Sequence, residues 1–515
     1  MGEIATKIRE IGYTNGLEKE ALLQGIATVH EELIAAKAHV ERLQQNKSTL
    51  QEKLNVATSP ILSIPVELAT EIFTLACDDG DGPQFDILPT PLTLGHTCRA
   101  WRRLACSMPH LWQTVVIRFS EERIDIQGEL LQEWLDRSKE LGLNFYFACP
   151  PHKFDSTAFY EPPPSLFKQL LQTSNRWSSL YSHNCLSLRN AIAETRASYP
   201  FPMLSRLRLY ITDFQETLHD DLSWTFGATP SLRSMDVKMF NPEGLDLEWE
   251  RLTHLKVQLH VGFCALIFPV CTLLESCELS SDVCSMYDTA DDLVPPDPLP
   301  STLSKLKTLS LTGQARAVTH LLDCVTAPIL EKLSIKVHPL RRWEWADMEE
   351  LMGDFRGALE DLFSRSSYKL TELSLCGLNA ESEDYVDILH PLSSLRRLSL
   401  TIPRPGKITD DFFDALNLED NPDLFSQLSE ANLEGDLGSV DIDTVIKMVR
   451  TRLSPPVSED KPQPALLRAM HVTYWNKSWA EKSDEGRMAK FYSELAALSS
   501  GQTSLTWQWN DGAQT

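Results

Sequence analysis

"LTELSLCGLN", residues 370–379, places apolar side chains at its first, fourth and sixth positions, which are Leu370, Leu373 and Leu375. The alternation of apolar and polar residues from position 373 onward is typical of a short β-strand with one buried face. The same phrase, with other apolar residues allowed, occurs ten times, beginning at residues 204, 232, 252, 274, 306, 330, 370, 395, 428 and 467. Successive phrases begin 20 to 40 residues apart. The sequence therefore predicts a repeated unit made of one strand and one connecting segment.

This repetition resembles the leucine-rich repeat, in which units of about 20–29 residues stack side by side. The resemblance implies an irregular α/β solenoid of horseshoe form over residues 201–515, with helices or loops inserted in the longer units. An ordinary α/β domain is the alternative. A helix is expected at residues 479–499, and SLTWQWN at residues 504–510 is predicted to be a last strand that caps the repeats. Residues 120–200 are interpreted as a connecting helical or first-repeat region.

Residues 1–58 are predicted to form one long helix, because apolar residues recur there with heptad spacing. The a positions are Ile26, Leu33, Val40, Lys47 and Leu54, and the d positions are Leu22, Val29, Ala36, Leu43 and Leu50. This seam predicts a coiled coil, either with a second copy of the chain, giving a homodimer, or with another helix. The alternative is an amphipathic helix that packs on the protein's own body. The Ser59-Pro60 sequence ends the helix.

Residues 59–119 contain two short helical patterns. The first is IPVELATEIFTLA at residues 64–76, which places Leu68, Ile72 and Leu75 on one helical face. The second lies in HTCRAWRRLACSMPHLWQTVVI at residues 96–117, and a Pro-x-Leu-Trp sequence closes it. Its apolar stripe begins just before this stretch and consists of Leu94, Cys98, Trp101, Leu104 and Ala105.

These patterns resemble an F-box, the small all-α module through which substrate receptors of SCF-type cullin-RING ubiquitin ligases attach to the Skp adaptor. Ile64 stands where the family usually has leucine, and the connector at residues 78–91 is long. A helical subdomain whose aromatic residues form a core and bind no partner is the alternative. The resemblance implies adaptor contacts at Ile64, Pro65, Glu67, Leu68, Ile72, Phe73, Leu94, Trp101, Leu104, Pro109, Leu111 and Trp112.

The composition disfavours several classes of partner. The formal net charge is −24, from 48 Lys and Arg against 72 Asp and Glu, and it would repel nucleic acid and anionic membranes. We therefore expect a protein partner. No apolar run approaches the roughly 18 residues of a membrane span, and the N-terminus lacks the apolar core of a signal peptide. A cytoplasmic or nuclear location is expected.

Motifs that carry chemistry are missing from the sequence. It contains no GxGxxG, P-loop, HExxH or GxSxG motif, and its eleven cysteines are not spaced as zinc ligands. We therefore expect no cofactor, no metal and no catalytic site, and we expect the cysteines to be free thiols.

The two resemblances together predict a non-catalytic receptor subunit that holds an unidentified target protein on its repeats. A repeat-protein scaffold without a role in ubiquitin transfer is the alternative. In each predicted strand, the residues between the apolar ones face away from the core. Their charges in the first six strands are six basic minus two acidic, or +4, whereas in the last four they are one minus three, or −2.

This imbalance predicts a target with an acidic or phosphorylated segment. Basic residues that merely decorate exposed strand positions are the alternative. The predicted target-binding residues are Arg206, Arg208, Lys238, Lys256, Lys332 and Lys336.

Overall fold

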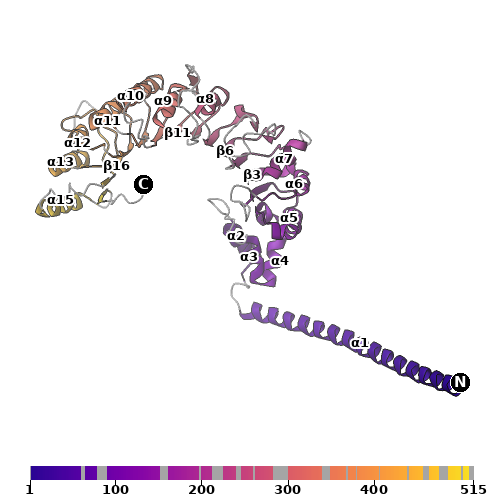
Figure 1. Ribbon diagram of the computed structural model, residues 1–515. Coiled ribbons are helices and arrows are strands. Elements are labelled where there is room, and N and C mark those ends of the chain that lie inside the picture. The colour runs from indigo at the N-terminus through magenta and orange to yellow at the C-terminus, as the bar shows by residue number, and fades with distance from the viewer. Residues whose placement is uncertain are drawn as a thin grey trace. The chain divides into compact units, whose positions relative to one another are not determined.

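The computed structural model of the chain divides into two compact units, Met1–Trp112 with Arg137–Lys139, and Gln113–Asp136 with Glu140–Thr515. The fold is mixed α/β, with a long N-terminal helix and a large parallel sheet, which confirms the predicted class (Figure 1). The structure describes residues 2–58, 64–77, 90–150, 160–195, 199–211, 224–238, 245–258, 261–281, 300–338, 348–366, 369–378, 380–404, 406–437, 440–455, 463–474, 485–499 and 503–509.

The first unit is helical. Its elements are α1 (Gly2–Thr58), α2 (Val66–Ala76), α3 (Thr90–Thr97), α4 (Arg99–Ser107) and the 3-10 turn η2 (Pro109–Trp112). Pro65 precedes α2, where the missing N–H of proline costs nothing. The Cys98 thiol caps α4 by accepting a hydrogen bond from the Trp101 amide at 3.4 Å. The predicted helix over residues 1–58 is therefore confirmed, whereas its end at Ser59-Pro60 lies outside the described residues.

A small aromatic core holds α2, α4 and η2 together. The rings of Phe73 and Trp101 meet edge to face, with centroids 5.0 Å apart. The Trp112 indole N–H donates to the Ala105 carbonyl oxygen at 2.8 Å, and the Arg137 guanidinium lies 4.4 Å from the Trp112 ring centroid. Large aromatic residues thus provide the buried surface that so small a group of helices needs.

The second unit contains, within its described residues, a parallel sheet of fourteen strands. The strands follow one another in the sheet in the order of the chain, apart from four short strands that form separate pairs. The sheet consists of β1 (Thr114–Arg118), β2 (Leu143–Ala148), β3 (Trp177–His183), β4 (Arg206–Tyr210), β6 (Ser234–Lys238), β8 (His254–Gln258), β9 (Ser276–Ser280), β11 (Thr308–Gly313), β13 (Lys332–Val337), β14 (Glu372–Cys376), β15 (Arg397–Thr401), β16 (Glu430–Gly435), β17 (Ala469–Tyr474) and β18 (Ser504–Trp509).

All ten predicted strands are present, from β4 to β17. Each begins at the third residue of its phrase, and that residue pairs with the third residue of the next phrase, as Lys332 pairs with Glu372 and Glu372 with Arg397. The apolar residues of each phrase are buried, as Leu373 and Leu375 are. The predicted last strand is confirmed as β18, and the helix expected at residues 479–499 is seen as α15 (Glu485–Leu498).

The sheet starts earlier than the predicted repeat region at residues 201–515, because β1, β2 and β3 precede it. These strands lack the leucine phrase, and in β2 and β3 aromatic residues fill several of the core positions. The ring centroids of Phe145 and Trp177 are 4.6 Å apart, and those of Trp177 and Phe201 are 5.4 Å apart. Part of the region interpreted as connecting, residues 120–200, therefore belongs to the sheet.

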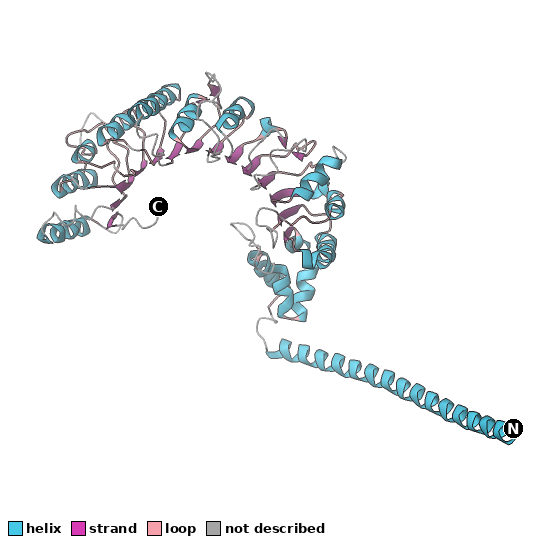
Figure 2. Cartoon of the chain, viewed as in Figure 1, coloured by secondary structure: helices cyan, strands magenta, loops and turns pink. Residues whose placement is uncertain are grey.

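Helices connect most strands and cover one face of the sheet (Figure 2). They are α5 (Ile124–Ser138), α6 (Pro164–Leu171), α7 (Leu186–Thr195), α8 (Val261–Val270), α9 (Ala315–Asp323), α10 (Met348–Arg365), α11 (Ser382–Leu389), α12 (Asp410–Ala415), α13 (Ile442–Leu453) and α15. The connections also contain two pairs of short strands, β5 (Trp224–Thr225) with β7 (Leu245–Asp246) and β10 (Ser301–Thr302) with β12 (Val325–Thr326). They contain the 3-10 turns η3 (Glu121–Arg123), η4 (Ser174–Arg176) and η7 (Trp249–Arg251) as well.

The two faces of the sheet differ in chemistry. The buried alternate residues pack under the helices, and we call that side the outer face. The remaining alternate residues line the opposite side, the inner face, which Figure 2 shows along the inside of the curve of this unit. Charged and hydroxyl side chains occupy most of the inner face, so a partner bound there would meet polar groups first.

Candidate docking surfaces

Helix α2 presents an apolar face to solvent. Leu68, Ile72 and Leu75 share this face and are each exposed by 50 to 68 %, and Val66 in the first turn is also exposed, by 55 %. Ala69 and Phe73, on the side that packs against the rest of the unit, are buried. Four exposed aliphatic side chains on an 11-residue helix are more than an isolated surface leucine, and such a patch is typical of a protein-docking surface.

The twelve residues predicted to contact an adaptor fall into three groups by exposure. Phe73, Leu94, Leu111 and Trp112 are buried in the core of the first unit. The half-buried residues are Ile64, Trp101, Leu104 and Pro109, and the exposed residues are Pro65, Glu67, Leu68 and Ile72. A buried side chain cannot contact a partner without rearrangement, so the exposed group and its half-buried neighbours form the accessible surface.

Hydrogen bonds hold α2 and α4 in place beneath this surface. The Thr74 hydroxyl lies 2.9 Å from Nε2 of His110 in η2, which ties the end of α2 to the turn after α4. The Arg102 Nε–H donates to the Gly95 carbonyl oxygen at 2.8 Å and fixes α3 against α4. The exposed face of α2 is therefore presented by a fixed support, which lowers the entropy cost of binding.

The six predicted target-binding residues all lie on the inner face, but half of them are paired with carboxylates. Arg208 Nε lies 3.8 Å from Asp236, Lys256 Nζ lies 2.6 Å from Glu278, and Lys332 Nζ lies 2.8 Å from Glu372. Each of these carboxylates is on the neighbouring strand. Arg206, Lys238 and Lys336 form no ion pair with a residue that the structure describes.

The predicted boundary between a basic first part and an acidic second part of the face lies between β13 and β14. At this boundary Lys332 and Glu372 form an ion pair. The pairing continues along the strand starts, because Arg397 lies 2.9 Å from Glu372 and 3.5 Å from Glu430. In-register parallel strands bring these opposite charges side by side, so the local charges largely cancel.

The middle residue of each strand forms a continuous row along the inner face. Register pairs Val116 with Tyr146 and continues through Tyr181, Arg208, Asp236, Lys256, Glu278, Ser310, Ser334, Ser374, Ser399, Asn432 and His471 to Thr506. The row thus changes from aromatic residues to alternating charges, and then to neutral hydrogen-bonding groups. Such a gradient can distinguish one end of a bound segment from the other.

An aromatic cluster marks the N-terminal part of the inner face. Ring centroids of Tyr146 and Tyr181 are 5.9 Å apart, and those of Tyr181 and Tyr210 are 5.4 Å apart. The Tyr210 hydroxyl donates to Asp236 at 2.7 Å. Sequence reasoning missed this cluster because β2 and β3 were not recognised as strands.

His183 lies beside these tyrosines, with its ring centroid 6.4 Å from that of Tyr210. Burial lowers the pKa of His183, and the nearby charges of Lys238 and Arg118 lower it further. The imidazole is therefore neutral near pH 7. Exposed Lys238 pairs with Tyr210 in the sheet register, and Arg208, which pairs with Tyr181, lies two residues after exposed Arg206. Tyrosine and arginine are both enriched at protein interfaces.

Two hollows lie toward the C-terminal part of the inner face. The larger, about 810 Å³, borders the strand starts and is lined in part by Thr371, Arg396, Ser429 and Arg468. The smaller, about 400 Å³, lies over the serine part of the middle row and includes Asn432 and His471. The larger hollow is lined by polar and apolar groups in similar measure. The smaller one is lined mainly by apolar groups, among them Leu333, Leu373 and Leu398.

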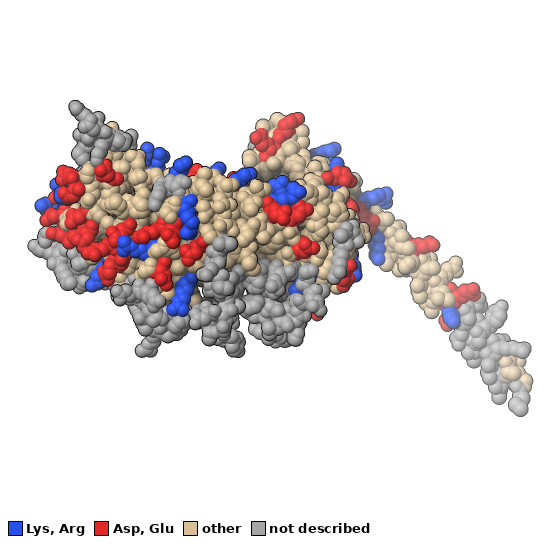
Figure 3. All heavy atoms as spheres, turned by 90° about the horizontal axis from the view of Figure 1, so that it is seen from above, with Lys and Arg blue, Asp and Glu red and all other residues tan. Residues whose placement is uncertain are grey.

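Acidic side chains gather on the outer side of the unit. Figure 3, seen from above, shows them at the end that carries helices α10 to α13. Exposed examples are Glu360, Asp387, Asp411, Asp420 and Asp443. This distribution accounts for part of the net charge of −24, and it leaves the outer side unsuited to an anionic partner.

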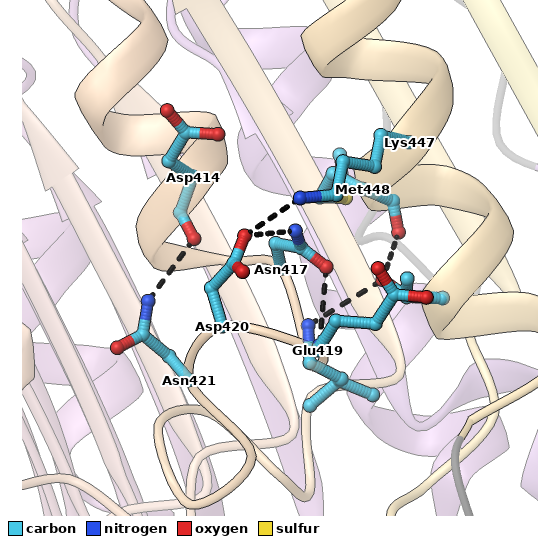
Figure 4. Close-up of polar contacts among 9 residues, drawn as sticks. Asp414, Asn417, Glu419, Asp420, Asn421, Lys447 and Met448 are labelled. Atoms are coloured by element: carbon cyan, nitrogen blue, oxygen red, sulfur yellow. Dashed lines mark hydrogen bonds and ion pairs between the residues drawn. The ribbon is translucent and has the colours of Figure 1, made fainter.

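The loop after α12 uses one of these carboxylates, that of Asp420, for its own structure (Figure 4). Asp420 accepts hydrogen bonds from Asn417 Nδ2 at 2.6 Å and from Lys447 Nζ at 2.9 Å, and the Lys447 contact lowers the pKa of Asp420. The Glu419 amide donates to Asn417 Oδ1 at 3.2 Å. Because these groups satisfy one another, we assign the cluster to loop structure and not to a ligand.

Neither a scan against protein-family models nor a search of curated proteins finds a match for this chain. Among the described residues, no cluster of His, Cys, Asp and Glu is arranged to hold a metal ion. None of the helices in the described ranges is long and apolar enough to cross a membrane.

Proposed function

We propose that the chain is the substrate-recognition subunit of an SCF-type ubiquitin ligase, with an F-box in its first unit and a leucine-rich-repeat-like solenoid in its second. The observation that carries this proposal is the exposed apolar face of α2. Leu68 and Ile72 remain about half exposed at 51 and 50 %, although Phe73 beside them is fully buried. The in-register sheet with its strands in chain order supports the repeat assignment.

The proposed mechanism is proximity and requires no catalytic group in this chain. Docking on the Skp adaptor, and through it on the cullin, would hold a bound target near the ubiquitin-charged enzyme. An intermolecular transfer then becomes effectively intramolecular, and its rate increases with the effective concentration of the target lysine. This role needs a cytoplasmic or nuclear location, where such ligases act.

The exposed residues Pro65, Leu68 and Ile72, with Glu67 beside them, are the proposed anchors for the adaptor. The buried aromatic residues are proposed to support the helix from below. Truncating an exposed anchor should weaken binding with little effect on folding. Truncating Phe73 or Trp112 should instead destabilise the unit by about 3–5 kcal/mol.

Target recognition is proposed on the inner face, with its basic and aromatic part between β2 and β6 as the main contact. Arg206 and Lys238 are the basic groups there that face solvent without a described ion pair, and the tyrosine cluster supplies rigid contact area. An acidic segment of a target protein fits this combination. Replacing Arg206, Arg208 and Lys238 together by Ser should weaken target binding, and the same binding should weaken as salt increases.

Adaptor binding by the full chain tests the proposal. Isothermal titration calorimetry with a purified Skp adaptor should show a tight complex for the unmodified chain. The double variant Leu68→Ala and Ile72→Ala should lose at least about 2 kcal/mol, a roughly 30-fold increase in the dissociation constant. Leu266→Ala is the matched control, because Leu266 is an aliphatic residue exposed by 61 % on α8. Unchanged affinity in the folded double variant would refute the F-box assignment.

A non-catalytic repeat scaffold without a ubiquitin-ligase role is the second candidate. It is favoured if the chain binds its target but does not co-purify with adaptor and cullin. A reconstituted ubiquitin-transfer assay separates the two functions, since only the receptor should increase modification of the bound target.

A further inference from the structure

Helix α1 carries an unpartnered apolar seam along more than half of its length. The seam consists of the residues at the a and d positions of the heptads from Leu22 to Leu54. All of them are large and aliphatic except Ala36 and Lys47. The eight large residues are each exposed by 49 to 68 %: Leu22, Ile26, Val29, Leu33, Val40, Leu43, Leu50 and Leu54. A seam of this length and spacing is the pattern of a coiled-coil helix.

The contact that α1 makes within its own unit leaves this seam accessible. Among residues 18–55, Ser48 and Glu52 are half-buried while all others are exposed. Glu52 forms an ion pair with Arg103 of α4. In the heptad frame these two residues occupy b and f positions, on the outer side of the helix. The intramolecular contact therefore uses the face opposite the seam, which disfavours the alternative that the seam packs on the protein's own body.

The charged residues beside the seam favour an identical helix as the partner and a parallel orientation of the two helices. Glu32 occupies a g position and Lys37 the following e position, and both are exposed. In a parallel pair of identical helices, Glu32 of each copy faces Lys37 of the other, so two attractive contacts form. In an antiparallel pair with every a residue opposite a d residue, Lys37 instead lies near Lys37 of the second copy. Identical helices are therefore complementary in the parallel direction.

We propose that the protein forms a homodimer in which α1 pairs with α1 of a second copy as a parallel, in-register coiled coil. This inference does not rest on the proposed ubiquitin-ligase role. Lys47 of one helix then faces Lys47 of the other at an a layer near the end of the seam, and this layer limits the affinity. The parallel direction places α2, α3 and α4 of both copies at the same end of α1, a helix about 85 Å long.

The oligomeric mass of the full chain tests the pairing. Sedimentation equilibrium should give twice the chain mass of 58.2 kDa. The variant Leu33→Glu with Leu43→Glu, which puts charge into the seam, should sediment as a single copy. Ala38→Glu with Gln45→Glu is the matched control, since it adds the same charge at f positions and should remain a dimer. Circular dichroism of every variant verifies that the body stays folded.

Several outcomes would overturn the proposal. A single-copy mass for the unmodified chain at high concentration would mean that the seam serves another partner. A three-copy mass, a seam variant that stays dimeric, or a control that dissociates would each show that this seam does not join two copies in the way proposed.

Charge exchange tests the direction of the helices. Glu32→Lys should raise the dissociation constant, because lysine would face lysine, and adding Lys37→Glu should restore it to near the original value. Lys47→Leu should lower the constant by about tenfold or more, since it removes the facing lysines. A double charge variant that is weaker than Glu32→Lys alone, or a Lys47→Leu variant without tighter pairing, would overturn the parallel register.

Discussion

Replacing Gly377 by Ala should destabilise the sheet at β14, for two geometric reasons. Gly377 follows β14 with a φ of +85°, a left-handed conformation that costs a residue with a side chain about 1–2 kcal/mol. A Cβ at this position would also lie 2.9 Å from the carbonyl carbon of Val337 at the end of β13. The clash is with backbone, which cannot rotate away as the tip of a side chain can.

The size of the expected loss in the free energy of unfolding follows from the contacts that must shift to relieve the clash. Relieving the clash shifts residue 377, whose N–H donates to the Thr401 carbonyl oxygen at 2.9 Å, and weakening that bond costs about 0.5–1.5 kcal/mol. The loss of backbone freedom in the unfolded chain offsets about 0.4–1 kcal/mol. We therefore expect a net loss of about 2 kcal/mol in the free energy of unfolding.

Urea denaturation followed by circular dichroism measures this loss, and hydrogen exchange should locate it in the amides of β13, β14 and β15. Gly353→Ala is the control, because Gly353 lies in α10 with no atom near its Cβ position. That change should stabilise the chain by up to about 1 kcal/mol through helix propensity. A Gly377→Ala midpoint equal to or above that of the original chain would refute the reasoning.

Three further predictions concern buried polar groups. Arg452→Met should lower the free energy of unfolding by about 2–4 kcal/mol in urea titrations. The buried guanidinium donates to the Phe425 carbonyl oxygen at 2.7 Å and also to the carbonyl oxygens of Leu416 and Leu424. An unchanged urea midpoint would contradict this prediction. Burial lowers the pKa of His320, so the unfolded chain binds more protons there. The contribution of His320 to stability is fully present above the ordinary histidine pKa of about 6.5, and it is lost as the pH falls through the lower pKa of the folded state. The thermal midpoint of His320→Gln should therefore decline less steeply on acidification than that of the original chain. A hydrogen bond with Cys185 and burial raise the pKa of Cys149, so iodoacetamide should modify Cys149 far more slowly than half-buried Cys106 in peptide mass spectra, and equal rates would exclude this environment.

The sequence was sufficient to predict the strands of the sheet wherever leucine fills the core. The phrase that contains Leu373 and Leu375 has one buried face in every copy, so its spacing alone locates the strand. Where Phe145 and Trp177 stand in place of leucine, the phrase cannot be recognised, and the alternation of β3 is interrupted by a register shift against β2. The side-by-side packing of those aromatic rings comes from strands about 30 residues apart, and no local pattern contains it.

The candidate surfaces were predictable in position but not in chemistry. That Lys332 faces away from the core follows from strand alternation, whereas its contact with Glu372 depends on a register between segments 40 residues apart. The same limit applies to the first unit. Leu68 and Phe73 both fit the helical pattern, and only packing determines that Phe73 is buried and Leu68 exposed.

The chain-order arrangement of the sheet has a consequence for how the protein folds. Paired strands are never far apart in the chain, since the separation ranges from 20 residues for Ser234 and His254 to 40 for Lys332 and Glu372. Each pairing therefore requires closure of a short loop, and the entropy cost changes little from one pair to the next. A chain of 515 residues can then have the low relative contact order of a much simpler fold. Folding can begin at any well-packed neighbouring pair and spread strand by strand in both directions, so an early stop during synthesis would still leave a folded N-terminal portion.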